Sequence, residues 1–555
     1  MSRASLVLRG GRVVSPSAPG GTAEAIAIDG DTIVAVGDNE AIDGLTSPET
    51  RVVNLAGRLA IPAFGDAHVH PISAGLESLR CDLLGVRDRK VYVERVAAHA
   101  AELPPEAWVL GGGWAMEAFP GGVPTAVDLD QVCGGRPAFL PNRDHHSAWV
   151  NSVALERAGV DASTPDPPAG RVERDERGQP TGALHDGAMS LVARILPPTS
   201  PEELADGLRA ALKRLHGHGI THWQDACVGA ASSLGMPDTF DTYATAMREG
   251  WLTARVRAAL WWDRGRGLEQ LTDFQGRREM AADGAFRATS VKMMLDGVCE
   301  TFTAAMSKAY LGEPGKNGTH RGDLFIDPAQ VADAVRVLDA EGFQVHFHAI
   351  GDRAVTTALD AIEGVPEERR GANRHHVAHL QFIAPADLER FSRLGAIANF
   401  QPLWACNEPQ MKELTIPFVG EERTKWQYST RSLLDWNTRL AFGSDWPVSS
   451  PDPLQEIHVA VNRMLSPALG QAGGEETTVP FRPDQRLSVE TAVAAFTAGV
   501  AYVNEDEDLL GCLEPGRRGD VAVLSQDIFS IPSTEIGQST VELTVAGGVV
   551  VHGDE

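Results

Sequence analysis

The chain has 555 residues, 43% of them hydrophobic, and a formal net charge of −26 at pH 7. This length is too great for one small core, and the ordinary hydrophobic content excludes wholesale disorder. So acidic a surface repels phosphate backbones and anionic lipids, and we expect neither a nucleic acid nor a membrane as a partner.

The sequence carries no signal for disulfide cross-linking or for export. Its six cysteines are scattered and form no CxxC pair, which argues against a disulfide framework or a thiolate zinc cluster. The opening stretch "MSRASLVLRGGRVV" has too short an apolar run for a signal peptide, and no run approaches the ~18 apolar residues of a membrane span. We therefore expect a soluble, cytoplasmic protein, with a homodimer as the commonest default.

The two ends of the chain resemble each other. "SLVLRGGRVVSP" and "EAIAIDGDTIVAVGD" near the start, and "GDVAVLSQDIFSI" and "VELTVAGGVVVHGDE" near the finish, alternate apolar and polar residues around turn signals. Gly-Gly and Asp-Gly turns between alternating runs indicate β-hairpins. Because strands this short need sheet partners, we predict one small β-sandwich domain from residues 1–62 plus 500–555. Two separate terminal sheets are the alternative.

The middle of the chain, residues 63–499, alternates strands with helices. Short apolar runs such as "RLAIPAFGDAHVH", "GITHWQDA" and "GFQVHFHAIGD" end in polar turns, and helical stretches such as "PAQVADAVRVLDAEG" follow. Strands alternating with helices indicate a parallel sheet, and this many units favour a closed (β/α)8 TIM barrel of the α/β class. Residues from about 77 to 194 interrupt the pattern, and we interpret them as an inserted lid segment over the barrel mouth.

The motif "GDAHVHP" places two histidines at the end of the first barrel strand. Residues i and i+2 of a strand project to the same face, so His68 and His70 point the same way and can chelate one cation. Two neighbouring surface histidines without a metal are the alternative. The apolar run before them favours the metal.

Further candidates end later strands. His348 in "VHFHAIGD" and His379 in "HHVAHLQ" each close an apolar run, and Asp445 ends another in "LAFGSDWP". A carboxylate there can bind a metal and accept a proton from water. For each histidine the alternative is a hydrogen-bonded core residue, and for "GSD" it is a helix N-cap. His346 shares a face with His348, which fits a packing residue or one that orients its neighbour.

Lys292 in "SVKMMLDG" lies inside an apolar strand, where a lysine is costly unless it is paired or chemically altered. One interpretation is a buried ion pair with Asp296 or Asp225. The other is that its amine reacts with carbon dioxide to give a carbamate, whose two oxygens bridge two cations. The spacing does not choose between them.

Taken together, these motifs resemble the amidohydrolase superfamily. The pattern comprises HxH after the first strand, a mid-barrel lysine followed by Asp-Gly, "HAIGDRAV", H-x-Q and GSD-x-P. Within the superfamily the chain is similar to the branch related to N-substituted formamide deformylases, the amidohydrolase-3 or YtcJ-like group. The similarity extends over nearly the whole chain, from the terminal strands to the closing "GCLEPGRRGDVAVL".

The resemblance implies a metal-dependent hydrolase that cleaves a carbon–nitrogen bond other than a peptide bond, in a small-molecule amide such as an N-formyl or N-acyl amine. It implies one or two divalent cations, with zinc as the leading candidate. His68 and His70 would bind one cation and His348 and His379 the other. Lys292 would bridge them as a carbamate, while Asp445 would bind metal and carry the proton.

The resemblance also suggests pocket walls, and the chain departs from the family pattern at some positions. The candidate walls are Trp114, His146, Trp149 and Trp404; each tryptophan has core packing as its alternative. The departures are Ala378 and Asp186, where the family commonly has Glu, and His145, where it has Gly. All six ligand positions are intact.

Two other functions compete with this one. A deaminase of the same superfamily usually has a Glu a few residues beyond a barrel histidine, whereas Ala349, Ile350 and Gly351 follow His348 here. A catalytically inactive barrel that serves as a binding or regulatory protein would be supported by the loss of a ligand residue, and none is lost.

Overall fold

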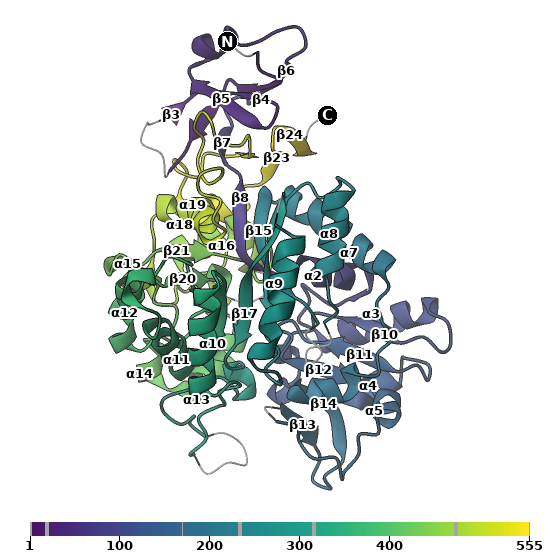
Figure 1. Ribbon diagram of the computed structural model, residues 1–555. Helices are drawn as coiled ribbons and strands as arrows, with labels where there is room; N and C mark the ends of the chain where they lie inside the picture. Colours follow the sequence, from purple (N-terminus) through teal and green to yellow (C-terminus); the bar gives the residue numbers. More distant parts are fainter. Residues whose placement is uncertain are drawn as a thin grey trace.

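The computed structural model describes residues 3–16, 22–168, 170–230, 236–282, 284–312, 318–470 and 475–553 (Figure 1). Eight parallel strands form its central sheet and confirm the predicted TIM barrel. In sheet order they are β21 (Leu440–Phe442), β20 (Ile397–Phe400), β19 (His376–His379), β18 (Gln344–Ala349), β17 (Phe286–Met294), β16 (Arg255–Trp261), β15 (Ile220–Val228) and β8 (Phe64–Val69).

The first and last strands, β8 and β21, meet to close the barrel. The backbone N–H of Asp445 donates to the carbonyl of His68 at 2.7 Å, and that of His70 donates to the carbonyl of Trp446 at 3.0 Å. Gly443 permits this approach, because a Cβ there would lie 2.5 Å from the backbone nitrogen of His68. The seam therefore holds the predicted ligands of both strands side by side.

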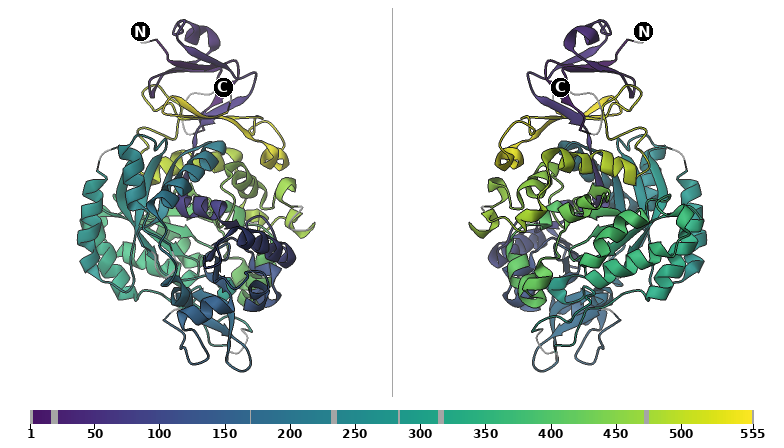
Figure 2. Two further views of the ribbon diagram at one scale, coloured as in Figure 1. Left: turned by 90° about the vertical axis from the view of Figure 1, so that its right-hand side faces the viewer. Right: turned by 90° about the vertical axis from the view of Figure 1, so that its left-hand side faces the viewer.

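Helices that alternate with the strands surround the barrel (Figures 1 and 2). The longest, α7 (Pro201–Gly217), starts with a capping box between Ser200 and Glu203. The others that flank the barrel strands are α2 (Pro71–Leu79), α8 (Phe240–Arg248), α9 (Leu271–Met280), α10 (Pro328–Ala340), α11 (Asp352–Glu363), α12 (Leu388–Leu394), α15 (Thr430–Asp435), α16 (Pro453–Asn462), α18 (Val489–Phe496) and α19 (Ala498–Val503). The apolar faces of all of these helices except α19 share one large hydrophobic core with the strands. Val500 and Val503 of α19 pack with Ala67 and Ala441 in a separate small cluster.

The two chain ends form the predicted β-sandwich beyond one end of the barrel (Figures 1 and 2). One sheet contains β5 (Thr32–Gly37), β4 (Ala25–Asp29), β1 (Leu6–Arg9) and β6 (Arg51–Asn54), in that order. The other contains β24 (Val549–Gly553), β23 (Val541–Ala546), β22 (Val521–Leu524), β7 (Leu59–Pro62), β2 (Arg12–Val14) and β3 (Thr22–Ala23). Apolar residues of both sheets pack in one cluster, so the ends of the chain build a single core.

The predicted boundaries of this domain remain a proposal. Helix α19 spans the predicted limit at residue 500 and contacts barrel strands β8 and β21. Residues 1–2, 17–21 and 554–555 of the predicted domain lie outside the described residues.

The insertion forms its own six-stranded sheet. In sheet order its strands are β13 (Gly170–Arg174), β14 (Pro180–Asp186), β12 (Ser147–Val150), β11 (Ala138–Pro141), β10 (Val109–Gly112) and β9 (Cys81–Asp82). Alternate residues enter separate cores, since Leu140 packs with helices α3 (Arg89–Glu102) and α4 (Ala126–Asp130), while Phe139 packs with α5 (Ser152–Ala158). Figure 2 shows this unit at the end of the molecule away from the β-sandwich.

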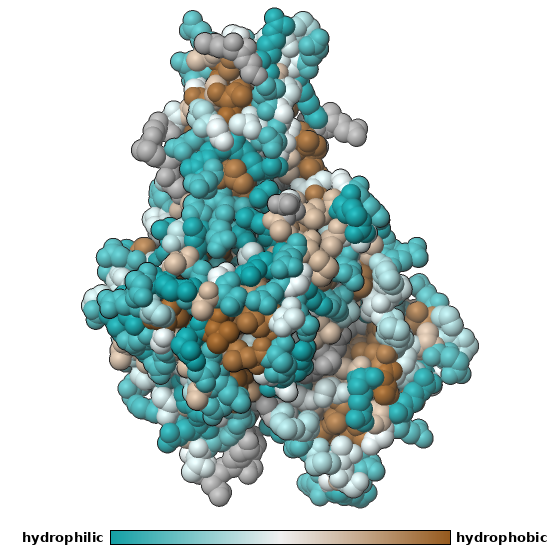
Figure 3. All heavy atoms as spheres, viewed as in Figure 1, coloured by the Kyte–Doolittle hydropathy of each residue, from teal (hydrophilic) through white to brown (hydrophobic). Residues whose placement is uncertain are grey.

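Hydrophilic side chains cover most of the face seen in Figure 3. The large exposed hydrophobic residues are scattered over many elements. Among the described residues, no helix combines the length and apolar character that a membrane crossing requires.

Candidate metal centre

All six predicted ligand residues lie at the carboxyl end of the barrel. They are His68 and His70 at the end of β8, Lys292 in β17, His348 in β18, His379 at the end of β19 and Asp445 just after β21. Only His70 is more than slightly exposed. Parallel strands present the same end to one mouth, so residues far apart in the sequence meet there.

The carboxylate of Asp445 lies close to three of the other predicted ligands. Its Oδ1 is 3.3 Å from Nε2 of His68 and 3.1 Å from Nε2 of His70. Its Oδ2 is 3.9 Å from Nδ1 of His379, and Nζ of Lys292 is 3.4 Å from Nε2 of His68. One ligand atom from each of His68, His379 and Asp445 lies within 4.8 Å of the other two. This spacing suits a shared cation.

His348 completes the group from the next strand. Its ring centroid is 4.5 Å from that of His379. Its Nε2 is buried and, like Oδ1 of Asp445, makes no hydrogen bond with any described residue. Buried nitrogen and oxygen atoms left without a hydrogen-bond partner in a set of imidazoles and a carboxylate fit a divalent cation such as zinc.

Burial controls the charges in the cluster. It lowers the pKa of His68, His348 and His379 well below the usual value, which keeps their imidazoles neutral and able to bind a metal. Burial also lowers the pKa of Lys292, to about 8. For Asp445, burial alone would raise the pKa, but the neighbouring histidines hold it well below its usual range.

Some residues of this cluster and of its surroundings have a strained backbone. Positive φ angles, which side chains other than glycine rarely adopt, occur at His379 (75°), Leu380 (51°) and Asp445 (54°). In the insertion they occur at His145 (60°) and Asp186 (45°). Such conformations cost about 1–3 kcal/mol each and persist where the surrounding structure fixes them, most often at functional sites.

Asp66, to which the sequence analysis assigned no role, ties two ligand segments together. Its Oδ1 accepts the backbone N–H groups of His68 and Ser444, both at 3.0 Å, and its Oδ2 accepts the hydroxyl of Ser444 at 2.6 Å. Burial raises the pKa of Asp66 to about 7. The only sequence signal was its place two residues before His68, on the same strand face.

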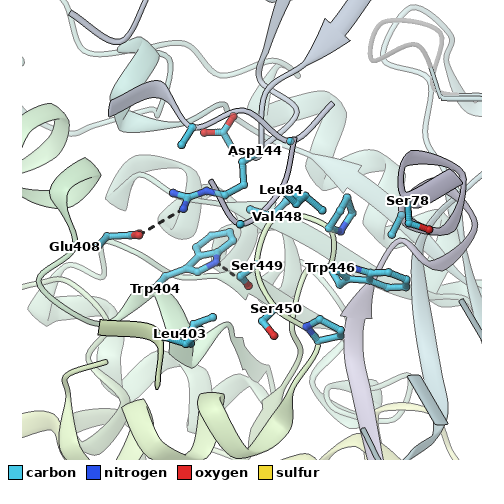
Figure 4. A pocket seen from close by; sticks show the side chains of 18 of the residues that line it. Ser78, Leu84, Asp144, Leu403, Trp404, Glu408, Trp446, Val448, Ser449 and Ser450 are labelled. Carbon is cyan, nitrogen blue, oxygen red and sulfur yellow. Dashed lines mark hydrogen bonds and ion pairs between the residues drawn. The ribbon is translucent and has the colours of Figure 1, made fainter. Parts of the chain in front are cut away.

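Trp404 lies next to the metal centre and lines a cavity of about 1050 Å³. Its ring is stacked on that of His379, and its Nε1 donates to Oγ of Ser449 at 3.3 Å. The cavity extends from the loops after the barrel strands to α7 and to His552 in β24. In Figure 4, Glu408 lies on one side of Trp404 and Trp446 on the other.

Trp114 and Trp149 do not line this cavity, which corrects the expectation that they form its walls. Both are fully buried in the core of the insertion, where their rings contact each other and Phe119. Their Nε1 atoms donate to the backbone carbonyls of Leu140 and Thr125. They belong to the core-packing alternative, because they occupy strand positions or loops that face the α3 side of the insertion sheet.

His146, the remaining candidate wall, reaches the edge of the metal centre but not the cavity lining. Its ring centroid is 5.6 Å from that of His348. Nδ1 of His146 is 2.6 Å from Oδ1 of Asp186, one of the two positions where the family commonly has Glu. Burial lowers the pKa of His146, but the charge of Asp186 outweighs it and the pKa rises to about 9. His145 pairs with Glu77 at 3.0 Å.

The comparisons with known proteins agree with this geometry. A family model described as "Amidohydrolase family" matches residues 51–552. Protein LONG AFTER FAR-RED 3 of Arabidopsis thaliana is 30% identical over 98% of this chain and 91% of its own length. N-substituted formamide deformylase of Arthrobacter pascens is 26% identical over 95% of this chain and 94% of its own length. A crystal structure of an uncharacterized metal-dependent hydrolase from Pyrococcus furiosus superposes with a TM-score of 0.71 at 26% identity, covering 95% of this chain and 100% of that one.

Proposed function

Because this chain belongs to the amidohydrolase family, we propose that it is a metal-dependent hydrolase of a carbon–nitrogen bond other than a peptide bond, in an N-formyl or N-acyl amine. The observation that supports this most is the buried meeting of His68, His379 and Asp445 at the barrel mouth, with Lys292 in contact. The name of the Arthrobacter pascens relative supports a formamide as the substrate.

We assign the cations to the six predicted ligands. His68 and His70 would hold one cation, and His348 and His379 would hold the other. Asp445 lies between the two histidine pairs, within 3.9 Å of a nitrogen on each side. When bound, a divalent cation such as zinc lowers the pKa of a water molecule from 15.7 to about 7 and polarises the substrate carbonyl.

We propose that Lys292 would carry a carbamate and offer its carboxylate oxygens as further ligands for the cations. The amine nitrogen attacks carbon dioxide, forms an N–C bond and releases one proton, which leaves a carboxylate at the tip of the side chain. Only the neutral amine can do this. Burial favours it, because it lowers the pKa of Lys292 to about 8.

Asp445 is proposed to carry the proton. Its carboxylate is ionised, buried and adjacent to the ligand nitrogens, so it can accept a proton from the attacking water. It then donates that proton to the nitrogen that leaves as the carbonyl–nitrogen bond breaks. A positive φ at Asp445 and the backbone N–H bond to His68 hold the carboxylate in place.

The cavity is proposed to bind the amine part of the substrate. Its volume of about 1050 Å³ lies at the upper end of the range for small-molecule sites, so it accommodates more than a formyl group. Trp404 offers a flat apolar surface beside His379, and Trp446 offers a second one.

The test combines metal analysis with a substrate screen. Purified protein reconstituted with zinc is expected to hold one or two cations per chain and to release amines from a panel of N-formyl and N-acyl amines. Asp445→Asn is expected to abolish release. Ammonia release from aminated heterocycles instead would favour the deaminase, and bound metal without turnover of any amide would favour the regulatory barrel.

A further inference from the structure

A continuous chain of hydrogen bonds links His68 to His379 beneath the metal centre. We call it the amide–imidazole circuit; in order it comprises His68, His346, Gln224, His376, Asn399, Gln401 and His379. All of these side chains are buried. An amide has a donor end and an acceptor end, and a neutral imidazole has one of each, so the direction of one bond fixes the next.

Gln344 sets the direction of the first half. Its Nε2 donates to the backbone carbonyls of Arg374 at 2.9 Å and Val503 at 2.8 Å. Because carbonyls only accept, this orientation is fixed and Oε1 of Gln344 must be an acceptor. Nε2 of Gln224 donates to that oxygen at 2.9 Å and to Oδ1 of Asn504 at 3.2 Å.

Gln224 therefore offers its Oε1 to two imidazoles. His346 donates to it from Nδ1 at 2.6 Å, and His376 donates from Nε2 at 3.0 Å. A neutral His346 then has no hydrogen on Nε2. This atom lies 2.9 Å from Nδ1 of His68 and must accept a hydrogen bond from it. Nε2 of His68, the atom that faces Asp445 and Lys292, is left without a hydrogen.

The orientation of Asn399 independently fixes the directions of the hydrogen bonds in the second half of the circuit. Its Nδ2 donates to the backbone carbonyl of Ala67 at 2.9 Å, which fixes the orientation of the amide. The same Nδ2 is 3.2 Å from Nδ1 of His376, so that nitrogen accepts and the proton of His376 is on Nε2. Gln344 leads to the same tautomer of His376 from the other side. The bonds of Gln344 and of Asn399 to backbone carbonyls thus predict the same tautomer of His376 independently.

Gln401 carries this direction to the second ligand. Its Nε2 donates to Oδ1 of Asn399 at 3.3 Å, so its Oε1 accepts from Nδ1 of His379 at 2.9 Å. A neutral His379 then has no hydrogen on Nε2, as is the case for His68. Reversing any bond would require a second proton on a buried imidazole or would turn an amide nitrogen away from a backbone carbonyl, and both are costly.

We propose that the amide–imidazole circuit fixes His68 and His379 in the tautomer that offers Nε2 to a cation, and that Gln224 and Gln401 act as positioning residues for metal affinity. The circuit ends at the two histidines that form a cluster with Asp445, in which one ligand atom of each residue lies within 4.8 Å of the other two. Nδ1 of His70, by contrast, has no hydrogen-bond partner among the described residues. The circuit therefore fixes the tautomers of His68 and His379, whereas it does not reach His70.

The first test measures zinc affinity by competition with a chromophoric chelator. Gln401→Met and Gln224→Met remove the acceptors on which the circuit depends, and each is expected to weaken zinc binding by about 10–100-fold. Gln270→Met is the matched control, because Gln270 is equally buried but bonds only to Asp263 and the backbone of Gly267. Affinities of both circuit variants within twofold of the control would overturn the proposal.

The second test reads the tautomers directly and needs no variant to fold. In metal-free native protein with ¹⁵N-labelled histidine, the imidazole nitrogen shifts are expected to show protonated Nδ1 and bare Nε2 for His68 and His379, assigned by single His→Gln substitutions. In Gln401→Met the His379 signals are expected to become a mixture of tautomers. A protonated Nε2 on either ligand in the native protein would contradict the proposal.

The inference rests on the metal-binding part of the proposed function, but its tests separate the two. Both measurements are made without substrate, so failure to find a hydrolysed amide leaves their outcome unchanged. Conversely, a native protein that binds zinc but has a protonated Nε2 on His68 or His379 would contradict this inference alone and leave the proposed function in place.

Discussion

The indole ring of Trp404 lies flat against the imidazole ring of His379, with centroids 5.2 Å apart and an interplanar angle of 4°. The stack joins a wall of the cavity to a candidate metal ligand, so a substrate that bound there as proposed would contact the ring that packs on this ligand. Trp404→Ala should raise KM for the best N-formyl or N-acyl amine substrate by up to about tenfold, since an aromatic stack contributes about 0.5–1.5 kcal/mol. Steady-state kinetics measures this, with the exposed Trp436→Ala as control. An unchanged KM would remove Trp404 from the substrate site.

Asp445→Asn should lower kcat by about 10²–10⁴-fold, because an amide cannot accept the proton that a carboxylate accepts. The overall fold should persist, since the asparagine side chain has the same shape. Single-turnover kinetics on metal-loaded protein checks the rate, and circular dichroism checks the fold. A folded variant with native kcat would assign the proton transfer to another group.

Lys292→Met should prevent carbamate formation and reduce the amount of metal bound, because the methionine side chain has no amine. Native protein equilibrated with ¹³C-labelled bicarbonate should show a carbamate carbon signal that this variant lacks. Lys308→Met, at an exposed lysine, is the control and should keep the signal. If native and Lys292→Met spectra match, Lys292 is an unmodified amine.

Removing the metal should lower the midpoint of thermal unfolding. The ligands come from several strands across the closing seam of the barrel, so a cation that binds only the folded state stabilises it, by about 4 kcal/mol at a thousand times Kd. Differential scanning calorimetry with and without a chelator measures the change. His68→Asn should unfold at the same temperature in both conditions, whereas a chelator effect that persists in this variant would point to a different site.

His222 should make the protein less stable in acid. It is buried at the floor of the barrel, and burial lowers its pKa to about 4 in the folded state, against about 6.5 when unfolded. Between pH 6.5 and 4 the unfolded state therefore binds more protons, and stability falls as the pH falls, by roughly 3 kcal/mol for this group. His222→Gln should flatten the dependence of the unfolding midpoint on pH across this range. His552→Gln, at a half-buried residue of β24, should not.

The sequence was sufficient for the barrel and the terminal sandwich, which the sheets confirm, and for the family, which the match to residues 51–552 confirms. It was sufficient because residues that end apolar runs in a parallel barrel are all brought to one mouth, whatever their separation. The same rule led from "GDAHVHP" to His68 and His70, and from later strands to His379 and Asp445.

The rest depended on contacts that no local pattern encodes. Gln224 and Gln401 look like ordinary polar residues until the fold places them against His346 and His379. Trp114 and Trp149 belong to an insertion with two cores, and only the three-dimensional sheet shows which face each ring enters. Without that information, aromatic residues in a segment beside the barrel mouth are therefore weak evidence for a pocket.

Strand β7 pairs with β2 on one side and with β22 on the other, so Pro62 meets Val521 across almost the whole chain. During synthesis, β7 and the first barrel strand are translated long before β22. The edge of β7 that pairs with β22 therefore stays unpaired until the end of the chain has been made. Loss of the last strands by premature termination would leave that edge unpaired and prone to aggregation, even though every candidate metal ligand had already been made.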